Sequence, residues 1–74
     1  MNITLYTLTD CPICEMVKTK LNNKNIVYTE KDFSEIASSI QSDYAPALEI
    51  KENDEAYIIN NPSKIVKWIN DYGE

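Results

Sequence analysis

The sequence has no histidine, and Gly73 is its single glycine among 74 residues. Without histidine the chain lacks the usual general base and the commonest metal ligand, which excludes a serine–histidine triad and disfavours a catalytic zinc site. Positive charge is also scarce, because twelve acidic residues against seven basic ones give a net charge of −5. An acidic domain repels nucleic acid and anionic membranes, so we expect neither as a partner.

Long apolar runs are absent as well, and none approaches the roughly 20 residues needed to cross a bilayer. Residues 1–6 show no basic stretch followed by an apolar one, the pattern of a secretory signal peptide. We therefore expect a cytoplasmic protein, in which paired thiols are more often catalytic or metal-binding than structural. The length predicts a single domain over residues 1–74, which we expect to be a monomer, and 43% hydrophobic residues are enough for a core.

Four segments of the chain are rich in β-branched, aromatic and aliphatic residues and predict strands. Residues 3–8 alternate so that both faces of the first strand are at least partly covered. Residues 26–29 predict a second strand, and residues 47–50 and 56–59 predict a hairpin around the acidic turn at 52–55. The acidic residues of that hairpin, Glu49, Glu52, Asp54 and Glu55, are expected to be solvated.

Three further segments show helical spacing or capping signals. Pro12 suits the first position of a helix whose apolar face comprises Ile13, Met16, Val17 and Leu21. Asp32 and Glu35 predict the capped start of a short helix, which carries an apolar stripe of Phe33, Ile36, Ala37 and Ile40 and is followed by a loop at 43–46. Asn61 and Pro62 predict the cap and first residue of a last helix, with a buried face of Ile65, Val66, Trp68, Ile69 and Tyr72.

The predicted order of elements is βαβαββα. The first βαβ unit should be parallel and right-handed, and the hairpin can extend the same sheet. The sequence therefore predicts an α/β protein with a four-stranded mixed sheet and helices on both faces.

Cys11 and Cys14 lie three positions apart where the first predicted strand passes into a helix. Unpaired N–H groups at a helix N-terminus favour a nearby negative charge, and the thiolate is the nucleophilic form of cysteine. Cys11 at the helix edge is the expected attacking thiol. Cys14, about one turn later on the same side, is the expected resolving thiol. Pro12 stiffens the turn between them.

Two other interpretations of the cysteine pair stay open. The pair could be inert and buried, although a bridge across so short a loop stabilises a fold little. The pair could also bind a metal, but four-coordinate zinc needs four ligands and this chain offers two thiols and no histidine. A shared metal or cluster would therefore require a second chain or added ligands.

The sequence resembles the glutaredoxins, most specifically over residues 5–21. The residues that carry the resemblance are Leu5-Tyr6-Thr7, Cys11-Pro12-Ile13-Cys14, Lys18, Leu21, Asp32, Ala45-Pro46 and Asn61-Pro62-Ser63-Lys64-Ile65. The resemblance implies a thioredoxin fold with three helices and dithiol exchange. It also implies a cis bond before Pro46 and pairing of the Ala45 backbone with an extended thiol substrate. The residues that it implies at the substrate or glutathione site are Pro12, Ile13, Lys18, Ala45, Pro46, Asn60 and Asn61.

The sequence departs from the family pattern at several positions. A basic residue is common shortly before the motif, but here Leu8, Thr9 and Asp10 occupy that stretch. Asp10 should oppose thiolate formation at Cys11. Ile13 replaces a common tyrosine, and Ile59-Asn60-Asn61 stands before the last helix, where most members have glycine. Asn61 replaces an acidic residue and cannot form an ion pair with the amino group of glutathione. These departures favour a reductant other than glutathione.

Three side chains have alternative interpretations. Lys18 could place positive charge near the thiolate or a ligand carboxylate, or it could be an exposed helix lysine. Tyr6 could line the rim of the site or be a buried strand residue, and Trp68 is expected in the core rather than at a binding surface.

The sequence thus predicts a thiol–disulfide oxidoreductase that reduces protein disulfides or glutathione mixed disulfides. No bound cofactor is expected. Either glutathione, as a co-substrate, or a thioredoxin-reductase-type flavoprotein would recycle it, the latter as in small redoxins that serve ribonucleotide reductase. The alternative class is a non-enzymatic module that binds a metal or cluster between two chains.

Overall fold

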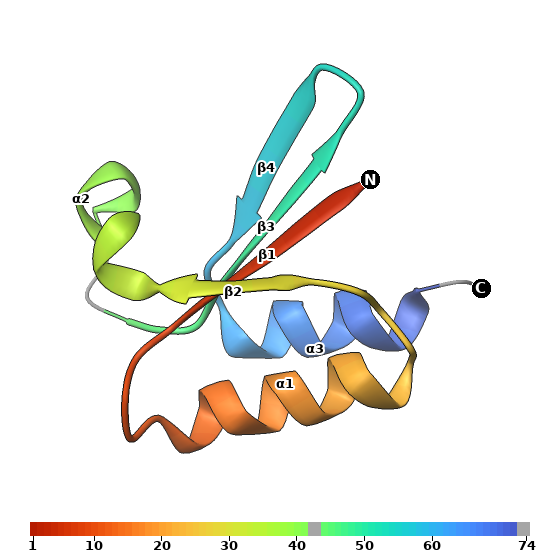
Figure 1. Ribbon diagram of the computed structural model, residues 1–74, viewed down its shortest axis with the longest axis horizontal. Helices are drawn as coiled ribbons and strands as arrows, with labels where there is room; N and C mark the ends of the chain where they lie inside the picture. Colours follow the sequence, from red (N-terminus) through yellow and green to blue (C-terminus); the bar gives the residue numbers. More distant parts are fainter. Residues whose placement is uncertain (42–43, 73–74) are drawn as a thin grey trace.

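Four strands form one mixed sheet in the order β2–β1–β3–β4 (Figure 1). In this computed structural model, which describes residues 1–41 and 44–72, β1 (Asn2–Thr7) runs parallel to β2 (Thr29–Asp32) and antiparallel to β3 (Ala47–Glu52). β4 (Glu55–Ile59) completes a hairpin with β3, which turns between Glu52 and Glu55 as the sequence predicts. Of the predicted loop at 43–46, Asp43 lies outside the described residues, as does Gly73.

Helices α1 (Pro12–Asn23) and α3 (Pro62–Asp71) lie side by side on one face of the sheet (Figure 1). The core between them and the sheet comprises Ile3, Leu5, Val17, Leu21, Ile26, Leu48, Ile50, Ile65 and Ile69. Trp68 packs at the edge of this core with its ring 5.3 Å from that of Tyr72, which agrees with its predicted core position. Each fully buried Leu or Ile side chain contributes about 1.5–3 kcal/mol to the stability of the fold.

The opposite face is covered near β1 by the 3-10 helix η1 (Phe33–Glu35) and the short helix α2 (Ala37–Ile40). Tyr6, Phe33, Ile36 and Ala47 form a second, smaller core there. Because side chains alternate along a strand, Tyr6 enters this core while Leu5 enters the larger one. The predicted architecture, a four-stranded mixed sheet with helices on both faces, is confirmed.

The second strand begins three residues later than the sequence predicts. Leu21 O accepts a hydrogen bond from Ile26 N after helix α1, and Asn25 takes a left-handed conformation (φ 58°) in the turn. Ile26 therefore reaches the core from a turn, and Val27 is left 90% exposed. The strand that pairs with β1 is instead the polar segment that begins at Thr29, which lies opposite Thr4.

Two predicted helices also differ from expectation, one in its buried face and one in its continuity. On α1 the buried side chains are Cys14, Val17 and Leu21, whereas Ile13 and Met16 are 44% and 40% exposed. Cys14 faces the core, and Ile13 and Met16, its neighbours on other sides of the helix, face solvent. The predicted single helix after Asp32 is interrupted at Ile36, which separates η1 from α2.

Candidate active site

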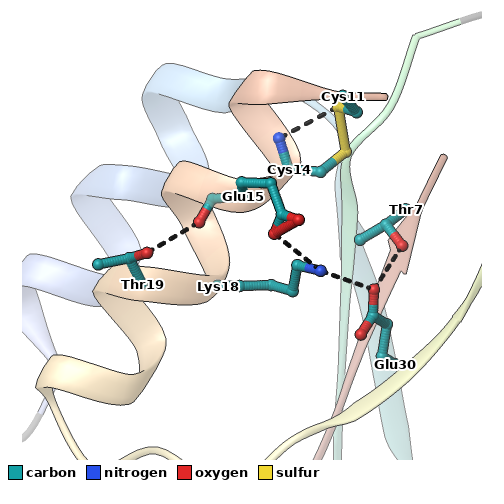
Figure 2. Close-up of polar contacts among 7 residues, drawn as sticks. All are labelled: Thr7, Cys11, Cys14, Glu15, Lys18, Thr19 and Glu30. Atoms are coloured by element: carbon teal, nitrogen blue, oxygen red, sulfur yellow. Dashed lines mark hydrogen bonds and ion pairs between the residues drawn. A yellow bond between two sulfur atoms is a disulfide. The ribbon is translucent and has the colours of Figure 1, made fainter. Parts of the chain in front are cut away.

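Cys11 and Cys14 form a disulfide at the N-terminus of α1, with their Cα atoms 5.2 Å apart. Cys11 is the N-cap of the helix and Pro12 its first residue. Cys14 N donates a hydrogen bond of 3.1 Å to the Sγ of Cys11 (Figure 2). Cys14 is 1% exposed, whereas Cys11 is half-buried, so an incoming disulfide reaches Cys11 first.

The position of Cys11 suits a thiolate when the disulfide is reduced. The amide of Cys14 already points at the sulfur, and helix N-terminal amides favour a negative charge there. Asp10, directly before Cys11, has a left-handed conformation (φ 58°), which aspartate tolerates better than most residues. Its carboxylate is the nearest charge in sequence, and its predicted opposition to the thiolate stays a prediction.

Lys18 belongs to a charged network on the helix turn after Cys14 (Figure 2). Its Nζ lies 2.9 Å from Glu15 Oε2 and 3.2 Å from Glu30 Oε2, and Thr7 Oγ1 donates a 2.8 Å hydrogen bond to the same Glu30 oxygen. The bonds to Glu15 and Glu30 raise the pKa of Lys18. The bonds from Thr7 and then Lys18 lower the pKa of Glu30.

This network joins α1 to Thr7 at the end of β1 and to Glu30 in β2. Thr7 and Glu30 were missed from the sequence, because their contact depends on the parallel register that places Glu30 beside Leu5 and Asp32 beside Thr7. Two carboxylates already compensate the charge of Lys18, so the lysine is more than an exposed helix residue. Its contact with a ligand carboxylate stays a prediction.

The peptide bond between Ala45 and Pro46 is cis, as the resemblance implied. Because Tyr6 is opposite Ala47 in the antiparallel pairing, Pro46 lies beside the end of β1, where the chain enters the cysteine turn. Pro46 is fully buried and Ala45 is half-buried. The substrate-binding residues predicted around the cysteines and around this loop therefore meet at the same end of the sheet.

Asn60 and Asn61 connect β4 to α3 and have different contacts. Asn60 Nδ2 donates to Tyr44 O at 2.9 Å and to Pro46 O at 3.3 Å, so its amide holds the cis-proline loop. Asn61 is the predicted N-cap of α3, confirmed by a 3.2 Å hydrogen bond that its side-chain oxygen accepts from Lys64 N. Asn61 has an extended backbone with φ −132°.

A groove of about 540 Å³ runs beside the cysteine turn. Its lining residues come from the β1–α1 turn, α1 and β2, and are Thr7, Leu8, Thr9, Asp10, Glu15, Lys18, Glu30, Lys31 and Asp32. Leu8 is 44% exposed at this groove, similar to Ile13 on the helix. Tyr6 is only 7% exposed, and its hydroxyl contacts Glu49 at 3.4 Å, so it is a buried strand residue.

Residues 1–41 and 44–72 contain neither a metal-binding cluster nor a membrane-spanning helix. In these ranges no three His, Cys, Asp or Glu side chains are placed so that they could hold a metal ion. No helix of the same ranges has the length and apolarity of a membrane span.

A cysteine pair at a helix N-terminus, beside a cis-proline loop on this mixed sheet, is the arrangement of the thioredoxin fold. The sequence model of one family, Glutaredoxin, matches residues 3–54. The chain belongs to the glutaredoxin family. The match ends before β4, so Asn60 and Asn61 lie outside it.

A similar solved structure is Leishmania TDR1, described as a unique trimeric glutathione transferase. The TM-score is 0.75 at 18% sequence identity, and the alignment covers 96% of this chain but 18% of that protein. This similarity confirms the thioredoxin fold. No curated protein sequence matches the chain.

Proposed function

We propose that the protein is a dithiol carrier that reduces protein disulfides and glutathione mixed disulfides through Cys11 and Cys14. The observation that supports this most directly is the asymmetry of the pair. Cys11 is accessible and its sulfur accepts the Cys14 amide, whereas Cys14 is buried behind it. These environments suit an attacking thiolate and a resolving thiol respectively.

The exchange has two steps. The Cys11 thiolate attacks one sulfur of the substrate disulfide, the S–S bond breaks, and the other sulfur leaves as a thiolate that takes a proton from water. Cys14 then loses its proton and attacks Cys11, which closes the Cys11–Cys14 disulfide and releases the second substrate thiol. Two electrons pass from the protein to the substrate, and an external reductant must return them.

The reductant has two candidates in this proposal, glutathione and a thioredoxin-reductase-type flavoprotein. The Asn61 side-chain oxygen is engaged with Lys64 N and carries no charge to pair with the amino group of glutathione. Lys18 is already paired with two carboxylates. Both observations favour the flavoprotein. We further propose that the protein acts in the cytoplasm, as a monomer and without a bound cofactor.

Substitution of each cysteine tests the assignment of roles. Cys11→Ser should abolish all exchange, because it removes the nucleophile. Cys14→Ser should retain a one-thiol reaction with glutathione mixed disulfides and lose dithiol reduction. Equal loss in both variants toward glutathione mixed disulfides would contradict these roles.

A second experiment distinguishes the reductants and the alternative class. The oxidised protein is incubated with NADPH and either glutathione plus glutathione reductase or thioredoxin reductase, and NADPH consumption is followed. Turnover with the flavoprotein alone supports our preference, and fast turnover with glutathione contradicts it. A visible absorbance band in a dimeric preparation, with neither system active, would instead indicate a cluster-binding module.

A further inference from the structure

The amide of Asn60 bridges both sides of Ala45. Its Nδ2 donates to the carbonyl oxygen of Tyr44, before Ala45, and to that of Pro46, after it. An amide nitrogen has two hydrogens, and both acceptors lie within hydrogen-bond distance, so one side chain occupies the two carbonyls that flank Ala45.

The backbone of Asn60 is held by the sheet, and the two carbonyls that its amide contacts belong to residues that differ in exposure. Asn60 is half-buried and directly follows Ile59, which pairs with Leu48, so the sheet fixes the backbone of Asn60. Pro46 is fully buried, whereas Tyr44 is 76% exposed. The Asn60 amide therefore joins an exposed end of the loop to its buried end, with Ala45 between them.

We infer that Asn60 is a positioning residue that fixes the Ala45 backbone for pairing with an extended substrate segment. The inference rests on the proposed function, in which a strand-like thiol substrate is held by main-chain hydrogen bonds at Ala45. A loop fixed in advance binds such a segment with less loss of conformational freedom. The hydrogen bonds of Asn60 go to the loop, whereas the sulfur of Cys11 accepts from Cys14 N, so we expect the attack of Cys11 on a small disulfide not to depend on Asn60.

Single-turnover kinetics separate peptide binding from the attack of Cys11 without any choice of physiological reductant. Pre-reduced protein is mixed either with bis(2-hydroxyethyl) disulfide or with an extended peptide whose cysteine forms a mixed disulfide with glutathione. After acid quenching, the loss of the two protein thiols is measured on the protein separated from the substrate. Asn60→Ala should raise the half-saturating peptide concentration about five- to tenfold, the effect expected from loss of hydrogen bonds in one contact. The limiting rate and the rate constant for the small disulfide should stay within about twofold.

Two further variants separate hydrogen-bond donation from side-chain shape. Asn60→Asp keeps the shape but cannot donate, so it should behave like Asn60→Ala, whereas Asn60→Gln keeps both donors and should recover part of the affinity. Asn70→Ala removes an amide side chain from an exposed position on α3 and should match the wild type. The small-disulfide rate also shows whether each variant is folded.

The possible outcomes separate this inference from the proposed function. If Asn60→Ala and Asn60→Asp bind the peptide as the wild type does, the inference is wrong while the exchange activity stands. Equal losses with both substrates would also overturn it, since they indicate a general structural role. If the wild type reduces neither substrate, the proposed function fails and the inference fails with it.

Discussion

Thr7→Val is the substitution that tests the charged network most directly. Thr7 is 8% exposed, and its hydroxyl donates a 2.8 Å hydrogen bond to Glu30 Oε2. A hydrogen bond to a charged group contributes about 1.5–3 kcal/mol when it is shielded from water. The Glu30 side chain is 43% exposed, so solvent replaces part of the lost bond, and the expected loss is about 0.5–1 kcal/mol. In a domain of this size that loss lowers Tm by about 2–8 °C.

The effect should depend on pH with a definite sign. The hydrogen bond from Thr7, followed by that from Lys18, lowers the pKa of Glu30 in the folded protein. A carboxylate with a lowered folded pKa stabilises the fold above its unfolded pKa, about 4.3, and loses this contribution as the pH falls through the folded value. The stability difference between wild type and Thr7→Val should therefore narrow below about pH 4.3.

Urea unfolding measures the coupling free energy between the Thr7 hydroxyl and the Glu30 carboxylate. Wild type, Thr7→Val, Glu30→Gln and the double variant form a double-mutant cycle, measured at pH 7 and again below pH 4. Thr7→Val should cost less in the Glu30→Gln background, and its pH dependence should be weaker there. An unchanged cost in both backgrounds and at both pH values would refute the hydroxyl–carboxylate coupling.

Three other expectations follow from burial, capping and local charge. Leu21→Ala should cost about 2–5 kcal/mol in urea unfolding, and Met16→Ala under about 0.5 kcal/mol; similar costs would contradict the observed face of α1. Asn61→Ala should cost about 1 kcal/mol through loss of the α3 cap, and an unchanged Tm would argue against that cap. Burial, followed by the Glu49 charge, raises the pKa of Tyr6 above 10.0, so Glu49→Gln should lower its midpoint in an ultraviolet titration, and an unmoved midpoint would exclude the Glu49 contribution.

The parts of the fold that depend on local chemistry could be predicted from the sequence. Pro12 and Pro62 begin their helices where proline costs no hydrogen bond, and Asn61 caps the second of them. The β3–β4 turn occurs at Asn53, whose left-handed conformation (φ 57°) suits asparagine. In each case the preference belongs to one residue and its immediate neighbours.

The predicted bounds of the second strand and the predicted buried face of α1 were wrong because tertiary contacts outweighed the local sequence pattern. Residues 26–29 have the composition of a strand, but the bond from Ile26 N to Leu21 O commits Ile26 to the end of α1. The polar residues from Thr29 to Asp32 then supply the edge strand, because hydrogen bonding to β1 needs a backbone rather than apolar side chains. On α1, Cys14 occupies the core position that spacing alone gives to Ile13.

The site divides in the same way between local and distant determinants. The environment of Cys11 arises within four residues, since Cys14 N reaches its sulfur across one helical turn. The cis-proline loop instead accepts hydrogen bonds from Asn60, fourteen to sixteen positions away in sequence and outside the region matched by the family. We therefore expect the thiol chemistry to follow from the motif itself, and the preference for extended substrates to depend on the segment that joins β4 to α3. A substitution at Asn60 alone should change the preference for extended substrates and leave the reactivity of Cys11 unchanged.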